Sequence, residues 1–251
     1  MRSFCPLRAV AESERFDKCR RRRDGRDPAG VDSRRREEAR VGMIRRNGAA
    51  KQHQDDHAVA IRFAEEHGLQ HEHSRRKLVH QWDAYPFGVG SFRRARNVVH
   101  GALRGRSVTA FEYSYFLMSD SVEENGYQRD SAHWFLVCVV DLDHPVPSLA
   151  AVRNVWLEWH GDELPGPSID VDHEKWSKMF TLVGEDEDFA RAVVTSENAA
   201  RCAEADIHAE WRFVNDELLL WVWRGRADNQ LVPILDVAKP LIEAAEGYPR
   251  A

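Results

Sequence analysis

The sequence predicts an α+β fold in which helices flank a mostly antiparallel sheet. Two pairs of apolar stretches, residues 97–103 with 107–116 and residues 207–214 with 217–223, are each separated by only a few turn-forming residues. Such short connections are typical of hairpins, which join antiparallel strands. The helical patterns lie before and after these pairs instead of alternating with single strands, so a parallel βαβ array is not expected.

The first helix is predicted from about residue 53 to Gly68. Asp55 and Asp56 suit a helix start, because carboxylates offset the positive end of the helix dipole. An apolar stripe follows them, and it consists of Ala60, Ile61, Phe63 and Ala64. Gly68 is a common type of helix end. Ser74 predicts the cap of a second short helix that runs to Trp82.

The strands in the middle of the chain are predicted from alternation and apolarity. Four side chains of residues 107–116 share one face, namely Thr109, Phe111, Tyr113 and Tyr115. Glu112 and Ser114 fall on the other face, which is typical of a half-buried strand. Residues 134–140 are apolar on both faces and therefore suit the centre of the sheet. A further strand is predicted over residues 152–159, and residues 119–131 predict a polar, mobile loop.

The C-terminal part predicts helices over residues 185–194, 196–205 and 231–245. Pro240 lies inside the last of these, so we expect a kink there. We expect the aromatic side chains of the second hairpin to form core beneath this helix. That expectation covers Trp211, Phe213 and at least one of Trp221 and Trp223.

The beginning of the chain differs from the rest in charge. Residues 1–50 contain 15 Lys and Arg against 8 acidic residues, whereas the remainder contains 21 against 33. Few apolar residues recur there at helix or strand spacing, so residues 1–52 are predicted to be disordered and residues 53–248 to form a single α+β domain. Three interpretations of the segment compete: a nucleic-acid-binding arm, a targeting peptide, or an untranslated stretch upstream of a start at Met43. We favour the last, because GC-rich upstream DNA tends to encode such Arg-, Gly- and Ala-rich text.

Three short motifs carry a resemblance to a known group of proteins. They are Pro86-Phe87-Gly88-Val89-Gly90, Arg94-Ala95-Arg96-Asn97-Val98-Val99 with Gly101, and Ala110-Phe111-Glu112-Tyr113-Ser114-Tyr115. Together with Trp211-Arg212 and Leu219-Leu220-Trp221, they resemble uncharacterised proteins of high-GC Gram-positive bacteria. The resemblance spans about residues 59–248 and implies no activity and no catalytic residues. Some of those proteins have a membrane anchor, and this sequence shows none.

Composition disfavours several classes of protein. No apolar run approaches the ~20 residues that cross a bilayer, so no membrane span is expected. The four cysteines are too scattered for a disulfide scaffold or a CxxC metal site, which favours a soluble protein of the cytoplasm. The chain has no Gly-x-Ser-x-Gly elbow, no P-loop and no dinucleotide fingerprint. We therefore assign no catalytic residue, expect no cofactor and favour a protein that is not an enzyme.

A basic region with interleaved aromatic residues, residues 82–106, is the main functional hint. From Arg75 to Arg106 eight Arg and Lys residues accompany a single acid, Asp83. Arginines beside exposed aromatic rings are typical of surfaces that bind anionic partners. The candidate contact residues are Trp82, Arg93, Arg94, Arg96, Arg104 and Arg106. Alternatively, this is a solvated face whose arginines pair with acids elsewhere in the acidic remainder.

A metal site is the second candidate. His71 and His73 share one face if their segment is extended, and Asp170 and His173 belong to an Asp-x-Asp-His pattern at a strand end. These four side chains would suit a divalent ion with an open position for water. However, their spacings match no defined metal motif, and loops commonly collect Asp and His.

We therefore expect a non-enzymatic binding or interaction module whose contact surface is the basic region of residues 82–106. Its partner would be an acidic protein or a nucleic acid. Two alternatives stay open at this point: a metal-dependent hydrolase, and single-stranded nucleic-acid binding through the same region.

Overall fold

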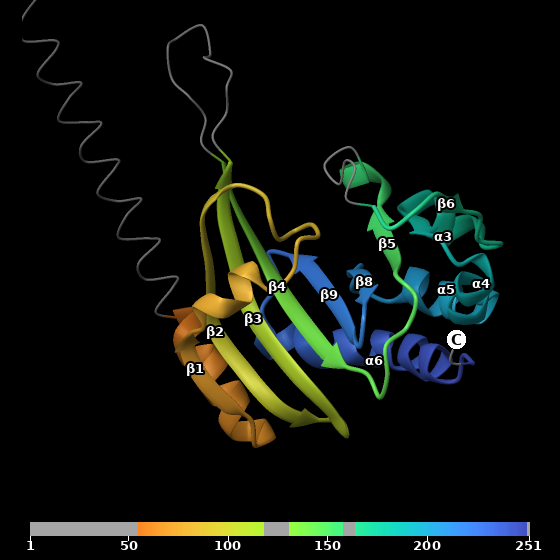
Figure 1. Cartoon of the computed structure of the whole chain (residues 1–251). Coiled ribbons are helices and arrows are strands. Elements are labelled where there is room, and N and C mark those ends of the chain that lie inside the picture. Colours follow the sequence, from red (N-terminus) through yellow and green to blue (C-terminus); the bar gives the residue numbers. More distant parts are fainter. Residues whose placement is uncertain (1–54, 118–130, 158–163, 250–251) are drawn as a thin grey trace, which may run out of the picture. The chain divides into compact units, whose positions relative to one another are not determined.

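The computed structural model describes residues 55–117, 131–157 and 164–249 of the 251-residue chain (Figure 1). The described residues all belong to one compact unit, residues 53–251. The predictions for residues 1–52, disorder and the start at Met43, lie outside the described residues. So does nearly all of the polar loop predicted over residues 119–131.

The described strands form one nine-stranded sheet in the order β1-β2-β3-β4-β9-β8-β5-β7-β6. Each pairing in it is antiparallel, so the α+β prediction is confirmed. The strands are β1 (Gln70–Ser74), β2 (Ser91–Leu103), β3 (Arg106–Leu117), β4 (Ser131–Asp141), β5 (Leu149–Arg153), β6 (Ser168–Ile169), β7 (Phe180–Gly184), β8 (Glu210–Val214) and β9 (Glu217–Trp223).

The α-helices of the described residues share one core with the sheet. They are the helix of residues 55–67, α3 (Glu174–Met179), α4 (Glu187–Val193), α5 (Ser196–Glu204) and α6 (Ala227–Glu246). Figure 1 shows α6 running behind the middle of the sheet. Its Leu231 and Ile242 belong to the same buried cluster as Phe63 of the first helix and Leu220 of β9. This burial of apolar area is the main stabilising contribution to the fold.

The opposite face of β2, β3, β4 and β9 is covered by an irregular segment, residues 75–90, which includes the 3-10 helix η1 (Arg76–His80). Trp82 of this segment stacks on Phe111 with ring centroids 6.2 Å apart. Its Nε1–H donates a hydrogen bond to Oε2 of Glu217 at 2.6 Å. Phe87 and Trp221 belong to the same buried cluster and are 0% and 1% exposed. The middle of the sheet is thus buried on both faces, which explains the continuous apolar run of β4.

The N-terminal elements match the predictions except at one point. The first helix covers residues 55–67, and Gly68 follows it with a φ of 67°. Ser74 does not cap a helix, because it is the last residue of β1, and the helix after it is the short η1. Residues 70–74 are polar and lack an apolar alternation, so only their pairing with β2 makes them a strand.

The C-terminal half contains elements that were not predicted. β5 begins three residues before the predicted strand of residues 152–159, and a 3-10 helix, η2 (Asn154–Trp156), follows it. β6, α3 and β7 were missed, whereas α4, α5 and the hairpin at Asn215-Asp216 agree with prediction. α6 starts at Ala227 and contains Pro233 and Pro240. Trp211, Phe213 and Trp221 are buried, as predicted.

Candidate interaction surface

Two irregularities in β2 position the side chains of the candidate surface. The register between β2 and β3 shifts at two places along the strand. Phe92 and Asn97 lie at these shifts with φ values of 55° and 49°, in the left-handed region. Bulges re-aim the side chains of the bulged strand. Phe92 is turned to solvent, whereas the Asn97 side chain is buried and reaches His57 of the first helix.

Three large aromatic side chains are exposed where β3 ends and β4 begins, at the upper end of these strands in Figure 1. Phe92 is 72% exposed, and Phe116 and Trp134 are each 41% exposed. The rings of Phe92 and Phe116 meet edge to face with centroids 6.3 Å apart. Trp134 is paired with Ser114, which shares a sheet face with Phe116. A group of exposed aromatic side chains on one face is typical of an interaction surface.

Arg94 and Arg96 lie on the same face. Arg94 is paired with Ser114 and Arg96 with Glu112, and both partners alternate along β3 with Phe116. Neither arginine takes part in an ion pair among the described residues. Burial, and then the neighbouring Arg94, lower the pKa of Arg96, so the charged form of Arg96 is less favourable here than in water. We call Phe92, Arg94, Arg96, Phe116 and Trp134 the aromatic–arginine surface.

Two of the predicted contact residues, Trp82 and Arg93, do not belong to the aromatic–arginine surface. Trp82 is only 5% exposed and belongs to the core beneath η1, so it is not available for a partner. Arg93 interacts with Tyr113, which lies in that same core on the opposite face. Burial raises the pKa of Tyr113, and Arg93 partly opposes this rise.

Arg104 and Arg106 lie at the other end of the β2–β3 hairpin, roughly 30 Å from Arg94 along the strand. Arg104 forms an ion pair with Asp236 at 3.4 Å. Arg106 donates from both terminal nitrogens to Glu246, at 2.5 and 2.7 Å. These two residues therefore follow the alternative of the sequence analysis, arginines paired with acids elsewhere in the domain. The predicted basic region is not one continuous surface.

A partly buried chain of polar side chains lies behind the aromatic–arginine surface. Nδ1 of His57 is 3.0 Å from Oδ1 of Asn97, and Nδ2 of Asn97 donates to Oε2 of Glu112 at 2.9 Å. Burial and the nearby Asp56 raise the pKa of Glu112 to about 7, although Asn97 opposes this rise. Glu112 is thus a carboxyl group that changes charge near neutral pH.

The histidines of β1 belong to a small cluster with His57. The ring centroid of His57 lies 5.1 Å from that of His71 and 5.0 Å from that of His73. Burial, followed by His57 and His73, lowers the pKa of His71. In the part of the chain that the structure describes, no three His, Cys, Asp or Glu side chains are arranged to hold a metal ion.

The four predicted metal ligands are not brought together. His71 and His73 lie on β1 at one edge of the sheet, whereas Asp170 and His173 follow β6 at the other edge. Seven strands separate the two edges (Figure 1), with neighbouring strands about 4.8 Å apart. His173 has a structural role, because its Nδ1 accepts a hydrogen bond from the Trp176 backbone N–H and caps α3. The four-residue metal site is therefore wrong.

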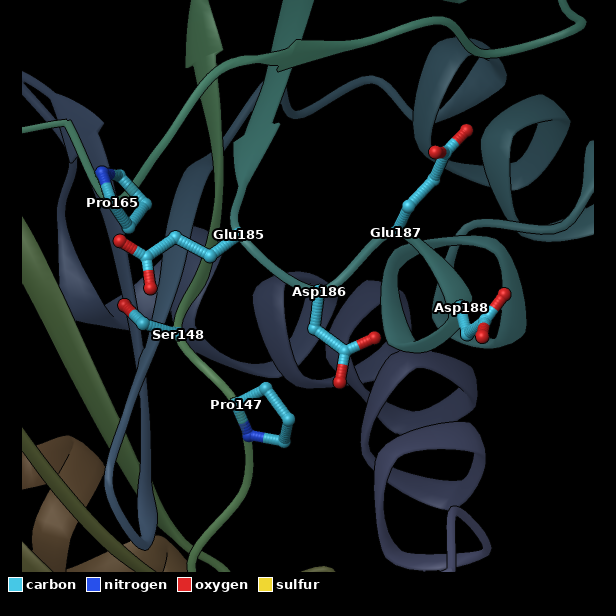
Figure 2. Close-up of a pocket in the computed structure, with 7 residues that line it drawn as sticks. All are labelled: Pro147, Ser148, Pro165, Glu185, Asp186, Glu187 and Asp188. Atoms are coloured by element: carbon cyan, nitrogen blue, oxygen red, sulfur yellow. The ribbon is translucent and has the colours of Figure 1, made fainter.

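A hollow of about 570 Å³ lies where β7 leads into α4 (Figure 2). It is lined by Pro147, Ser148, Pro165, Glu185, Asp186, Glu187 and Asp188. Figure 2 shows the four carboxylates pointing in different directions instead of converging. Asp186 already accepts a hydrogen bond from the Phe189 backbone N–H as the cap of α4. Asp186, as this cap, and Glu187, which forms an ion pair with Arg191, therefore have local structural roles.

Two cysteines of the described residues are buried and unlinked. Cys138 is fully enclosed in the middle of β4, and burial raises its pKa. Burial likewise raises the pKa of Cys202 on α5 to about 11. Both thiols stay protonated near neutral pH, which agrees with the prediction of structural cysteines.

Sequence reasoning missed Phe116 and Trp134, and it assigned no role to Glu112. The alternation along residues 107–116 contained a signal for Phe116, because that residue has the same parity as Glu112 and Ser114. Trp134 was predicted as the first residue of a central strand, which suggests burial. In the structure it is exposed, because none of the helices that the structure describes covers it. No helix of the described residues is long and apolar enough to cross a membrane.

The fold is similar to that of a known protein. No protein family model and no curated protein sequence matches the chain. The crystal structure of the mycobacterial trehalose monomycolate transport factor A superimposes with a TM-score of 0.56 and 15% sequence identity. The match covers 78% of this chain and 97% of that chain. Mycobacteria are high-GC Gram-positive bacteria, the group to which the sequence resemblance pointed. At this level of identity the likeness shows that the two proteins share an α+β fold.

Proposed function

We propose that this protein is a non-enzymatic binding module that contacts an acidic protein partner through the aromatic–arginine surface. One observation carries the proposal: two arginines without ion-pair partners among the described residues lie on one sheet face beside three exposed aromatic rings. Aromatic and arginine side chains are enriched in the energetically dominant parts of protein interfaces. The sheet and its cores supply the rigid support that such a surface needs.

The charges of Arg94 and Arg96 indicate what the partner offers. The two side chains are on one face, two residues apart, and Arg94 helps to lower the pKa of Arg96. A carboxylate placed between them would relieve this repulsion and form charge-assisted hydrogen bonds. The aromatic rings would at the same time be removed from water, which is favourable in proportion to their buried area.

A protein partner is favoured over a nucleic acid by the charge of the domain. Residues 51–251 carry 33 acidic residues against 21 Lys and Arg, so a long polyanion would be repelled by most of the surface. An acidic protein segment needs only the local positive patch. The similar fold belongs to a protein named as a transport factor, and that name agrees with a binding role.

Binding to poly-L-glutamate, measured by isothermal titration calorimetry at low salt, tests the proposal. The double substitution Arg94→Glu and Arg96→Glu is expected to weaken binding about tenfold or more, since each reversal replaces attraction by repulsion. The matched control is Arg191→Glu with Arg201→Glu, which makes the same change in net charge on α4 and α5. The control is expected to stay within about twofold of the wild type, because rim charges away from a contact act only weakly.

Two results would contradict this function. Equal weakening by both double variants would show that only net charge matters. Tighter binding of an oligothymidylate, lost on the same Arg94 and Arg96 substitutions, would assign the surface to single-stranded nucleic acid instead.

Substitution of Trp134 by Ala separates the aromatic contribution, and we expect it to weaken the binding of a phenylalanine-containing acidic peptide more than that of poly-L-glutamate.

A further inference from the structure

Glu112 lies directly beside the aromatic–arginine surface. It is the cross-strand partner of Arg96, and Ser114, two residues further along β3, is the partner of Arg94. Directly opposed residues of an antiparallel pair have Cβ atoms about 5 Å apart and point to the same side. Glu112 is therefore the carboxyl group of the described residues that pairs in register with an arginine of this surface.

The surroundings of Glu112 come from three other elements. The helix of residues 55–67 contributes Asp56 and His57, and β2 contributes Arg96 and Asn97. Arg226, at the start of α6, attracts Glu112 and forms an ion pair with Asp56 at 3.6 Å. On the β4 side the register neighbour of Glu112 is Leu136, which is apolar.

Two further sets of groups affect Glu112 indirectly, through Arg226 and through His57. Asp228 of α6 lies 3.5 Å from Arg226, and the histidines of β1 contact His57. A small cavity of about 10 Å³ is lined by Asp56, Asn97, Glu112 and Arg226, among others. It has about the volume of one water molecule, while the Arg226 side chain is 40% exposed, so solvent screens these charges only in part.

We propose that the proton on Glu112 modulates the aromatic–arginine surface: ionised Glu112 offsets part of the charge of Arg96 from the neighbouring strand, and protonated Glu112 leaves that charge fully available to an acidic partner. The proposal rests on the proposed function and describes the regulation of the same site. It requires no movement of the backbone, since only one charge changes.

The direction of the effect follows from the charge of each form. Burial raises the pKa of Glu112 to about 7. Below that pH the group is neutral and Arg96 has no ionised register partner, so an acidic ligand binds more tightly. Above it the carboxylate competes with the ligand. The expected ratio of affinities between pH 6 and pH 8 is about two- to fivefold, the range for one partly exposed charge pair.

Poly-L-glutamate binding at pH 6 and pH 8 tests this inference when the wild type is compared with Glu112→Gln. Other titratable groups also contribute to the pH dependence of binding, so the wild type alone is not decisive. Glu112→Gln is expected to show a clearly smaller difference in affinity between pH 6 and pH 8 than the wild type. The matched control is Glu72→Gln, which removes a carboxylate of β1 that pairs with Arg75. This variant is expected to keep the pH dependence of the wild type. Equal pH dependence in the wild type and Glu112→Gln would overturn the proposal.

A direct titration keeps the inference distinct from the proposed function. The carboxyl ¹³C resonance of Glu112 reports its pKa, and Arg96→Leu is expected to raise that pKa because a stabilising positive charge is lost. Poly-L-glutamate must raise it too, since protonation and binding are reciprocally linked. An unchanged pKa in Arg96→Leu would show that Glu112 does not act on Arg96. A changed pKa with no binding of poly-L-glutamate at either pH would overturn the acidic partner while leaving the charge coupling intact.

Discussion

Replacing Glu112 by Gln should make the protein more stable at alkaline pH, with a gain that shrinks as the pH falls and vanishes below about pH 4.5. The carboxyl group has a folded-state pKa of about 7, against 4.5 for an ordinary glutamate side chain. A raised carboxyl pKa means that the folded state prefers the neutral form. The stability that goes with the neutral form is fully present below pH 4.5 and is lost as the pH rises through about 7.

The size of the effect follows from the two pKa values. The free-energy penalty for ionising Glu112 in the folded protein is about 3 kcal/mol at pH 8 and about 1 kcal/mol at pH 5. Gln has the shape of a protonated carboxyl group and no charge, so Glu112→Gln avoids this penalty at every pH. The difference in stability between the variant and the wild type is therefore expected to grow by about 2 kcal/mol between pH 5 and pH 8.

Urea unfolding followed by tryptophan fluorescence at a series of pH values measures this difference. All other titrating groups are common to both proteins, so their contributions cancel. Glu66→Gln, on the exposed side of the first helix, is the control, because it removes a carboxylate at an exposed position and should change the stability by less than about 0.5 kcal/mol. A constant or falling difference for Glu112→Gln would refute the argument that burial and Asp56 hold this carboxyl group in its neutral form.

Two further predictions concern the core and the backbone near the surface. Trp82→Phe removes the Nε1–H that donates to Glu217, and urea unfolding should show a loss of about 1–3 kcal/mol, whereas Trp134→Phe at the exposed site should cost less than about 0.5 kcal/mol. Gly90→Ala would place a Cβ 2.5 Å from Tyr115 Cδ2 at a φ of 68°, so the melting temperature should fall by several degrees. Gly68→Ala has a φ of 67° but no atom within 4 Å of the new Cβ, and its smaller loss, about 1 kcal/mol, measures the backbone strain alone. Equal losses at the two glycines would argue against a steric role for Tyr115.

Elements with strong local patterns were predictable. The first helix has an apolar stripe and a terminal glycine, and its end was predicted correctly, since it runs to residue 67 and Gly68 follows. Its predicted start near residue 53 lies outside the described residues. The hairpin at Asn215-Asp216 was predicted from its turn residues, because Asn tolerates the positive φ of 55° that the turn requires. β1 and β6 were missed because they are short and polar or only two residues long, and pairing with a neighbouring strand is what orders them.

The candidate site was predicted only in part. Arg94 and Arg96 were predicted as contact residues but placed before the strand of residues 97–103, whereas both belong to β2. Arg104 and Arg106 lie near them in sequence and at the far end of the hairpin in space. Trp82 was assigned to the surface because it is an aromatic residue within the basic region, yet its side chain is buried in the core cluster beneath η1. A cluster in sequence does not predict a cluster in space when a strand of 13 residues runs between its halves.

By itself, the sequence determined the local character of this protein: an acidic α+β domain with hairpin-linked strands, buried thiols and a basic stretch before and within β2. These features depend on composition and on periodicities of a few residues, which local backbone geometry translates directly into helices and strands. Only the tertiary structure decided which charges face one another. Glu112, Asn97, His57 and Arg226 come from four elements, and the bulge at Asn97 and the antiparallel register of β2 with β3 bring them together. Pairing register and strand order depend on contacts across the whole domain, and no short window of sequence contains them.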